Sequence, residues 1–579
     1  MGRGRDTGSD RPLEPDEARA QGNDPDAVRM SGDGPDGGTR AGEGAQRGVG
    51  DVGGEREGTD TNRTDPEGHH LTDPDAATNR ATSDAGRDTA HGPAGDQQEG
   101  WNIPSKVLPA IGSRDLPEPI PVRKLLGASV VILATALGSG EFIIWPYITT
   151  QIGIAFLWLA AFGFFMQYVL NMEIERYTLA TGETAVTGFT RYWKPWGIIF
   201  VLGAILPNAF PGWASGGATM INYMGLIGEG AIPIVASIVL VATALALTLS
   251  PVVYQALEKI QMVLVGIIML FLVVGVFVAT KLGAWASVVT QAPGSIPGLP
   301  GAIATLGAAT FLGAIAFAGA GGASNLTQSN YIRDKGLGMG GRMPKIVSPI
   351  TGEEVAAPSL GYTFPLNEEN MRRWRTWWKV ANREHFITFF VLGLLTLIML
   401  SVLVWSTVGG GVGGVEADTT FIDKEAAVLG NQIGDWFRIF FLFAGMVVLF
   451  STSIGIMDYV SRLSASELKV SFFPDSETIT ESRIYFALAW VIAIAGSLIL
   501  VAGLEAPLVL LIIAASGGGV VMFFYSGMLI WMNTRALPDP IKLKGWRLVM
   551  MWITFLIFAG LSVYLVYYQL ATNVFGGGG

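Results

Sequence analysis

The chain has 579 residues, and its formal charge of −10 arises in the first 100 residues, which hold 22 acidic side chains and 11 arginines. The remaining residues carry 27 basic and 26 acidic side chains and every aromatic side chain of the protein. Repeated apolar runs longer than about 18 residues in this part are typical of transmembrane helices and exclude a soluble enzyme. The absence of Cys from the sequence excludes a disulfide scaffold and a cysteine-ligated metal site.

Residues 1–100 are rich in Gly, Asp, Arg, Pro and Thr and contain no Phe, Trp, Tyr, Ile or Lys. Such a segment cannot bury enough apolar surface to offset the entropy of ordering it, so we predict a disordered acidic tail that acts as a solvated spacer. No apolar core follows the initiator Met, so we expect no signal peptide. Residues 101–123, with several prolines, are predicted to form a juxtamembrane lead-in.

Hydropathy predicts eleven transmembrane spans. They are expected near 125–150, 155–178, 196–224, 232–250, 255–280, 300–329, 384–408, 436–460, 482–503, 507–533 and 547–570. The chain is thereby divided into helices 1–6 over 124–332, a loop over 333–383, helices 7–11 over 384–570 and a short C-terminus over 571–579.

The loop charges predict the orientation of these spans. With the N-terminus in the cytoplasm, 22 Lys and Arg residues lie inside and three lie outside, namely Lys281, Lys424 and Arg438. The positive-inside rule therefore predicts a multi-pass protein of the cell membrane with a cytoplasmic N-terminus and an external C-terminus.

The loop 333–383 contains the stretch Met371–Lys379, in which basic residues alternate with Trp. This pattern is typical of an amphipathic helix on anionic lipid. Nucleic-acid binding is the alternative for such a sequence, but the adjacent membrane span argues against it, so we expect lipid and no nucleic acid as partners. The sequence does not predict an oligomeric state.

Two predicted spans are interrupted by glycine at matching depths. The first contains Gly138, Ser139, Gly140 and Glu141, and the sixth contains Gly319, Gly321, Gly322 and Asn325. They are five spans apart, as expected if spans 1–5 and 6–10 are inverted repeats. Matched interruptions indicate a binding site near the middle of the membrane, although glycine can also serve close helix packing.

Glu141 is the predicted centre of this site, because an unpaired carboxylate is costly at the middle of a bilayer. No Lys or Arg is expected at that depth, so a transported cation or a proton is its predicted partner. A neutral Glu141 bonded to Ser139 is the structural alternative. Further ligands are expected from Ser139, Ser324, Asn325 and the carbonyls near Ala136, Gly138 and Gly319.

Two other acidic residues are candidates for proton transfer or gating. Asp458 lies near the cytoplasmic end of the eighth span, where Arg462 at i+4 offers a structural ion pair. Glu258 opens the fifth span and is a candidate gate or a surface residue. His385 is the only histidine outside the tail and is expected far from the interruptions, so we expect no histidine relay at the site.

At the two interruptions the chain resembles the natural-resistance-associated macrophage protein (Nramp) family of proton-coupled divalent-metal transporters. The resemblance covers roughly 120–570 and includes span 8 (FSTSIGIM) and span 10 (AASGGGVVMFFYSGMLIWMNTR). The family motif Asp-Pro-Gly-Asn is replaced by Gly138 to Glu141, and Met-Pro-His-Asn by Gly322 to Asn325. The resemblance implies an all-α membrane protein with a LeuT-like 5+5 inverted repeat.

The loss of the family's Met removes the soft ligand that favours transition metals. We therefore expect a secondary transporter, not an enzyme, that moves Mg²⁺ or Mn²⁺ in preference to Fe²⁺, with no cofactor beyond the transported cation. Proton-coupled transport of a small organic solute, such as an amino acid, is the alternative on the same fold, with Glu141 as the proton carrier. A channel has no supporting filter sequence.

Overall fold

The computed structural model describes residues 101–120, 138, 140–209, 211–249, 253–344, 360–409, 418–504 and 506–573. The predicted tail, most of the first half of span 1 and the last residues of the C-terminus lie outside the described residues, as do the candidate site residues Ala136 and Ser139.

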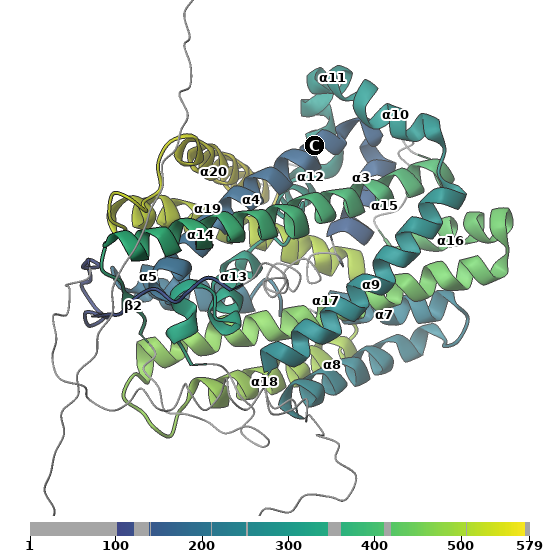
Figure 1. Ribbon diagram of the computed structural model, residues 1–579. Helices are drawn as coiled ribbons and strands as arrows, with labels where there is room; N and C mark the ends of the chain where they lie inside the picture. The colour runs from purple at the N-terminus through teal and green to yellow at the C-terminus, as the bar shows by residue number, and fades with distance from the viewer. Residues whose placement is uncertain are drawn as a thin grey trace, which may run out of the picture. The chain divides into compact units, whose positions relative to one another are not determined.

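Helices make up nearly all of the described regular structure (Figure 1). The long helices are α4 (Leu157–Thr181), α8 (Ile232–Leu249), α9 (Val253–Ala279), α12 (Leu299–Ala316), α13 (Ala323–Lys335), α14 (Glu368–His385), α15 (Gly393–Thr407), α16 (Thr420–Ile433), α17 (Asp435–Phe472), α18 (Glu481–Val501), α19 (Pro507–Arg535) and α20 (Trp546–Asn573). Shorter helices are α3 (Trp145–Ile152), α5 (Ala185–Thr190), α6 (Pro195–Ile205), α7 (Gly212–Tyr223), α10 (Leu282–Thr290) and α11 (Ala292–Ser295).

Short turns and one strand pair complete the fold. The π-helical segments are η2 (Gly140–Ile144) and η7 (Phe386–Leu392), and the 3₁₀ turns are η3 (Ile154–Phe156), η4 (Glu229–Ala231), η5 (Ile296–Gly298) and η6 (Gly338–Arg342). Strands β1 (Gly112–Ser113) and β2 (Tyr362–Thr363) pair in parallel.

Nine of the helices in the described part of the chain are long and apolar enough to cross a membrane. They correspond to nine of the eleven predicted spans. The predicted third span is instead divided into α6 and α7, because Pro207 and Pro211 lie between them and remove two backbone donors. The first span is described only from its interruption onward, through η2 and α3.

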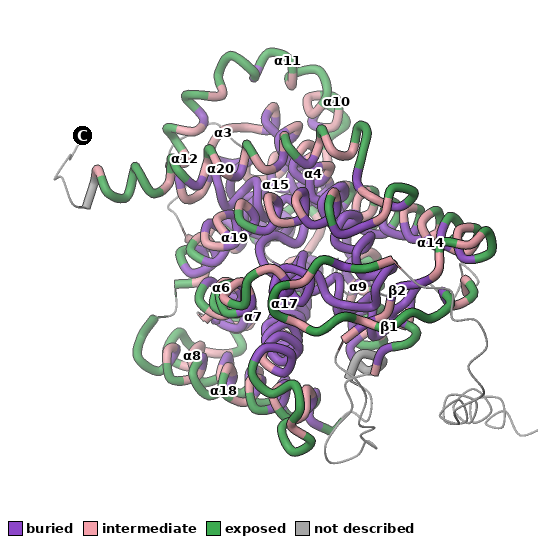
Figure 2. The backbone as a smooth tube through the Cα atoms, turned by 90° about the vertical axis from the view of Figure 1, so that its left-hand side faces the viewer, coloured by how far each residue is buried: buried purple, intermediate pink, exposed green. Residues whose placement is uncertain are grey.

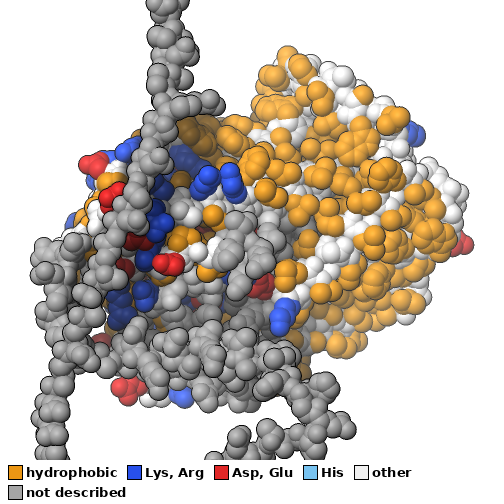
Figure 3. Space-filling model, viewed as in Figure 1, with side chains coloured by type: hydrophobic (Ala, Val, Ile, Leu, Met, Phe, Trp, Pro, Cys, Tyr) orange, Lys and Arg blue, Asp and Glu red, His pale blue; other side chains and the backbone are white. Residues whose placement is uncertain are grey.

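The surface divides into an apolar part and a charged end. Large apolar side chains such as Phe277 on α9 and Leu282 on α10 are 85% and 89% exposed. In Figure 3 such side chains cover the half of the molecule that contains α9 and α10, whereas Lys and Arg gather at the end where α14 begins. Exposed apolar side chains of this density fit contact with lipid.

The buried residues concentrate where α4, α13, α17 and α19 meet, and helices such as α8, α18 and α20 have exposed outer faces (Figure 2). Helix α17 contacts α7, α9, α13 and α18, while α19 contacts α12 and α20. With 38 residues, α17 is about 57 Å long at about 1.5 Å per residue, well beyond the apolar thickness of a bilayer. A helix of this length therefore extends past the apolar layer of a membrane that it crosses.

The segment 101–120 lies against α14 through several hydrogen bonds. The amide of Leu116 donates to Oδ1 of Asn370 at 3.0 Å, and Nε1 of Trp377 donates to the carbonyl of Pro117 at 2.9 Å. Trp377 is only 1% exposed and Trp374 only 3%. Two of the three Trp side chains of the predicted amphipathic stretch therefore pack within the protein, whereas Trp378 is half-buried.

Candidate functional site

The sixth span unwinds where the glycines predict. Helix α12 ends at Ala316 and α13 begins at Ala323, and the residues between them are not helical. Gly319, Gly321 and Gly322 have φ values of 119°, 70° and 63°, a region that residues with a Cβ rarely adopt. The carbonyls and amides of this segment are therefore free of the helical hydrogen-bond pattern.

The two interruptions lie next to each other. A Cβ built on Gly140, in the first interruption, would lie 2.1 Å from the carbonyl oxygen of Phe317 in the second. A Cβ on Gly322 would lie 2.9 Å from the Cα of Gly518, on α19. Only glycine permits these approaches, so the interrupted spans and α19 enclose one site.

Gln167, at the middle of α4, holds the unwound segment in place. Its Nε2 donates to the carbonyls of Ala316 and Ala318, each at 2.7 Å. Its Oε1 accepts from the amide of Gly321 at 3.0 Å and from Nδ2 of Asn325 at 3.2 Å. One side chain thus satisfies backbone groups that the unwinding releases. Gln167 was not among the predicted site residues, although a polar residue in the centre of a span is a signal for such a role.

Glu141 lies in η2 and is fully buried. Neither carboxylate oxygen has a hydrogen-bond partner. An ionised carboxyl group in this position is strongly unfavourable unless a cation or a proton neutralises it. The alternative bond to Ser139 falls on a residue outside the described part of the chain.

The second interruption contributes oxygen atoms. The Oδ1 atom of the buried Asn325 has no hydrogen-bond partner, while its Nδ2 donates to Gln167 and to the hydroxyl of Tyr525 at 3.1 Å. The hydroxyl of Ser324 donates to the carbonyl of Ala320 at 3.0 Å and also bonds the carbonyl of Gly321. The Oδ1 atom of Asn325 is therefore still available as an acceptor.

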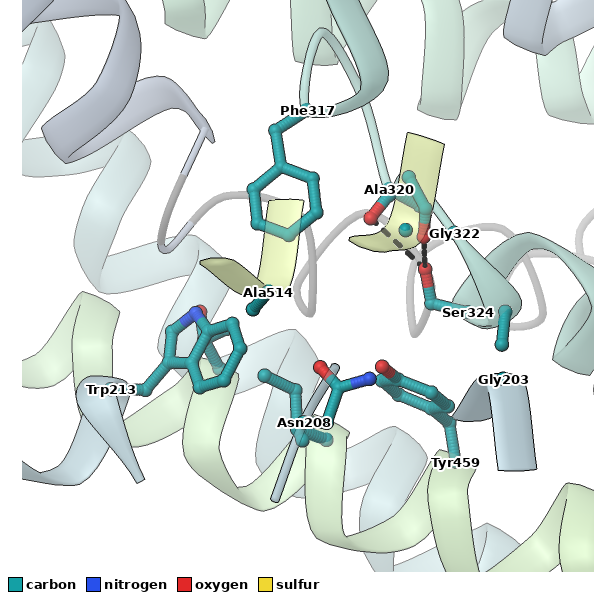
Figure 4. A pocket seen from close by; sticks show the side chains of 14 residues that line it. Gly203, Asn208, Trp213, Phe317, Ala320, Gly322, Ser324, Tyr459 and Ala514 are labelled. Carbon is teal, nitrogen blue, oxygen red and sulfur yellow. Dashed lines mark hydrogen bonds between the residues drawn. The ribbon is translucent and has the colours of Figure 1, made fainter. Parts of the chain in front are cut away.

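A small cavity of about 10 Å³, room for about one water molecule, adjoins the second interruption. Figure 4 shows Phe317 above it, Ser324 at one side, and Trp213, Asn208 and Tyr459 along the opposite wall. Of the predicted site residues only Ser324 lines this cavity. Gly138, Glu141, Gly319 and Asn325 do not, and the wall residues from α7 and α17 were not predicted.

No group of three or more His, Asp or Glu side chains in the described residues could hold a metal ion. Any cation at the interruptions would therefore be held by one carboxylate together with amide, hydroxyl and carbonyl oxygens.

The structure places Asp458 away from the interruptions, in a buried ion-pair network. Its carboxylate accepts from Arg462 at 2.7 and 3.0 Å, as the i, i+4 spacing predicts, and from the hydroxyls of Tyr331 and Tyr485 at 3.0 and 2.7 Å. Arg462 also pairs with Asp334 on α13. This network joins α13, α17 and α18.

Glu258, on α9, forms an ion pair with Lys335, the last residue of α13. The pair is partly exposed, and it joins the end of the sixth span to the fifth.

A protein-family model described as natural resistance-associated macrophage protein-like, Nramp, matches residues 131–568. The chain belongs to the Nramp family. Members of this family transport divalent metal cations. No curated protein sequence matches the chain significantly.

Crystal structures of the manganese transporter of Eremococcus coleocola share the fold of this Nramp chain. One structure, of a single-residue mutant, has a TM-score of 0.56 at 12% identity and covers 81% of this chain and 92% of its own. Another, in complex with an aromatic bis-isothiourea substituted compound, has a TM-score of 0.54 with the same identity and coverage. The prediction of an all-α membrane protein with a LeuT-like fold is confirmed.

Proposed function

We propose that this Nramp protein is a secondary transporter that carries a hard divalent cation, Mg²⁺ or Mn²⁺ in preference to Fe²⁺, through alternating access coupled to protons. The observation that carries the proposal is Glu141, a fully buried carboxyl group in the first interruption with no hydrogen-bond partner. A solved relative of the same fold is a manganese transporter, which supports a metal as the substrate.

In this proposal Glu141 supplies the charged ligand. Asn325 supplies its unused Oδ1, Ser324 its hydroxyl oxygen and Gly319 a carbonyl of the unwound segment, while Gly138, Ser139 and Ala136 supply further oxygens from the first span. Such a set suits hard cations, which prefer oxygen ligands, and a partly hydrated ion would complete its coordination with water. The absence of a thioether and an imidazole at the second interruption disfavours softer ions.

We propose further that the protein lies in the cell membrane with its N-terminus in the cytoplasm and its C-terminus outside. The excess of Lys and Arg in the loops at the end that includes α14 supports this orientation. Glu258 and Lys335 would then form an inner gate, and Asp458 would hold the cytoplasmic ends of α13, α17 and α18 together without carrying protons.

Uptake of Mg²⁺ and Mn²⁺ into proteoliposomes tests the function and its central ligand. We expect saturable uptake by the natural protein and its loss in Glu141→Gln, which keeps the side-chain volume and removes the charge. Glu425→Gln is the matched control, because Glu425 on α16 is also buried at 4% exposure and lies outside the site. Unchanged cation uptake in Glu141→Gln contradicts the ligand assignment.

Transport of a small organic solute is the second candidate, favoured by the cavity beside the second interruption. Phe317 and Trp213 give this cavity an aromatic wall. Calorimetric titration with Mg²⁺, Mn²⁺ and Ca²⁺, followed by competition with an amino-acid panel, separates the two candidates. Binding of no cation together with saturable binding of an amino acid would replace the first proposal by the second.

A further inference from the structure

A second group of buried titratable residues lies where α4, α13 and α14 meet. Glu175 is 1% exposed and His385 fully buried, and Oε1 of Glu175 lies 3.5 Å from Nδ1 of His385. The same oxygen accepts from Nε2 of Gln328 at 2.8 Å. The second carboxylate oxygen of Glu175 has no hydrogen-bond partner. The metal site proposed above makes no use of this pair.

A line of polar side chains connects this pair to the interruptions. Gln167, Asn171 and Glu175 are spaced i, i+4 and i+8 on α4, so they share one face of that helix over about 12 Å. Asn325 and Gln328 lie on the facing helix α13. Gln167 bonds Asn325 at the end of this line next to the interruptions, and Glu175 bonds Gln328 at the opposite end.

Asn171 lies between these two contacts and has no partner of its own. Its side chain is fully buried, and neither its amide nitrogen nor its amide oxygen forms a hydrogen bond. A buried amide in this position is expected to bind ordered water. Water at Asn171 would extend the hydrogen-bonded line from Gln167 to Glu175.

The proposed transport reaction requires such a second route. Glu141 is the only acidic side chain in the described parts of the two interruptions, so a cation bound to it leaves no carboxylate there for a proton. Glu175 is the next carboxyl group along the polar line from the site. In the proposed topology it lies on the cytoplasmic side, since α4 runs inward.

We propose that Glu175 and His385 form the proton-transfer site of this transporter, reached from the interruptions along the face shared by α4 and α13. The inference rests on the proposed function. A proton from water in the polar line binds Glu175 at its free oxygen, passes to the ring of His385, and leaves to cytoplasmic water, so that both groups return to their starting forms. A carboxylate and an imidazole in contact are suited to this exchange.

Charged groups from three helices surround the pair. Glu384 lies beside His385 on α14 and is 7% exposed, and Arg547 on α20 lies 3.6 Å from Glu173 on α4. Arg176 on α4 forms a two-fold hydrogen bond with Glu173, while α13 contributes the neutral Gln328.

Aromatic contacts hold the imidazole in place. The ring of His385 stacks on Tyr168 and Phe389, with centroid distances of 5.9 and 4.7 Å. These contacts allow a substitution that keeps the packing and removes the titratable group, namely His385→Phe.

The test measures metal and proton fluxes together in proteoliposomes, with Mn²⁺ as the probe ion, a trapped metal dye and a trapped pH dye. For Glu175→Gln we expect Mn²⁺-driven proton influx to fall by about tenfold or more. Mn²⁺ uptake down its own gradient should persist in the same variant and lose its dependence on external pH. His385→Phe should behave in the same way, and it gives the answer if Glu175→Gln does not reach the membrane.

Glu425→Gln again serves as the control for loss of a buried carboxyl group and should keep both fluxes. Proton influx at the natural level in Glu175→Gln or His385→Phe overturns the inference while leaving metal transport in place. Natural protein that moves Mn²⁺ without protons also overturns it. Natural protein that moves no metal contradicts the proposed function instead, so the two failures are distinguishable.

Discussion

Gln167→Leu tests whether one side chain holds the sixth span open. The substitution keeps a similar volume but leaves the carbonyls of Ala316 and Ala318 and the amide of Gly321 without their partner. A buried polar group left unpaired costs about 1–3 kcal/mol, so three of them give an upper range of about 3–9 kcal/mol. Water entering the adjoining cavity would recover part of this loss, and we expect the lower half of the range.

The assay is unfolding of the purified protein in mixed micelles, followed by tryptophan fluorescence. Gln261→Leu is the matched control, because Gln261 is also a fully buried glutamine but bonds only Ser451, at 2.5 and 3.1 Å. The free energy of unfolding should fall further in Gln167→Leu than in the control, by about 2 kcal/mol or more. Equal losses in the two variants would refute the role of Gln167 in holding the unwound segment.

Two further substitutions test the packing around the site. Gly140→Ala places a methyl group against the carbonyl of Phe317, and thermal unfolding should show a free energy of unfolding lower by about 1–3 kcal/mol. In the control Gly301→Ala the methyl group meets no atom within 4 Å, so the free energy of unfolding should not fall. Equal losses in the two variants would contradict the close approach at Gly140. Arg462→Met leaves the buried Asp458 without its cation and removes one of the two arginines that pair with Asp334, at a cost of about 3–5 kcal/mol in the same assay. Adding Asp458→Asn should recover part of that loss, and no recovery would contradict the ion pair.

Hydropathy was sufficient to predict nine of the eleven spans, because a helix in lipid must be apolar over most of its length. Hydropathy did not predict the break in the third span. There Pro207 and Pro211 divide an apolar stretch into two short helices without changing its mean hydropathy. The glycines of the sixth span were informative for a different reason. Gly319, Gly321 and Gly322 have positive φ values, which residues with a Cβ rarely adopt. The glycines in the sequence therefore indicate directly where the backbone unwinds.

The partners of the polar residues could not be predicted in the same way. Glu175 and His385 lie in different spans, and only the packing of α4 against α14 brings them within 3.5 Å. His385 was expected at the start of the seventh span, far from the interruptions, so its proximity to Glu175 was not predicted. Gln167 carried a usable signal, a polar side chain at mid-span, but its partners are backbone groups that exist only because another helix unwinds.

The contact between segment 101–120 and α14 has a consequence for how the protein is made. Leu116 and its partner Asn370 are separated by 254 residues, and six spans lie between them. At about 5–20 residues per second, a ribosome needs roughly 13–50 s to synthesise that interval. Leu116 therefore waits for its partner on α14 while six spans are synthesised, although residues 106–109 of the same segment find Arg191 much earlier. The docking of Leu116 onto α14 is therefore possible only after the first six spans have been synthesised.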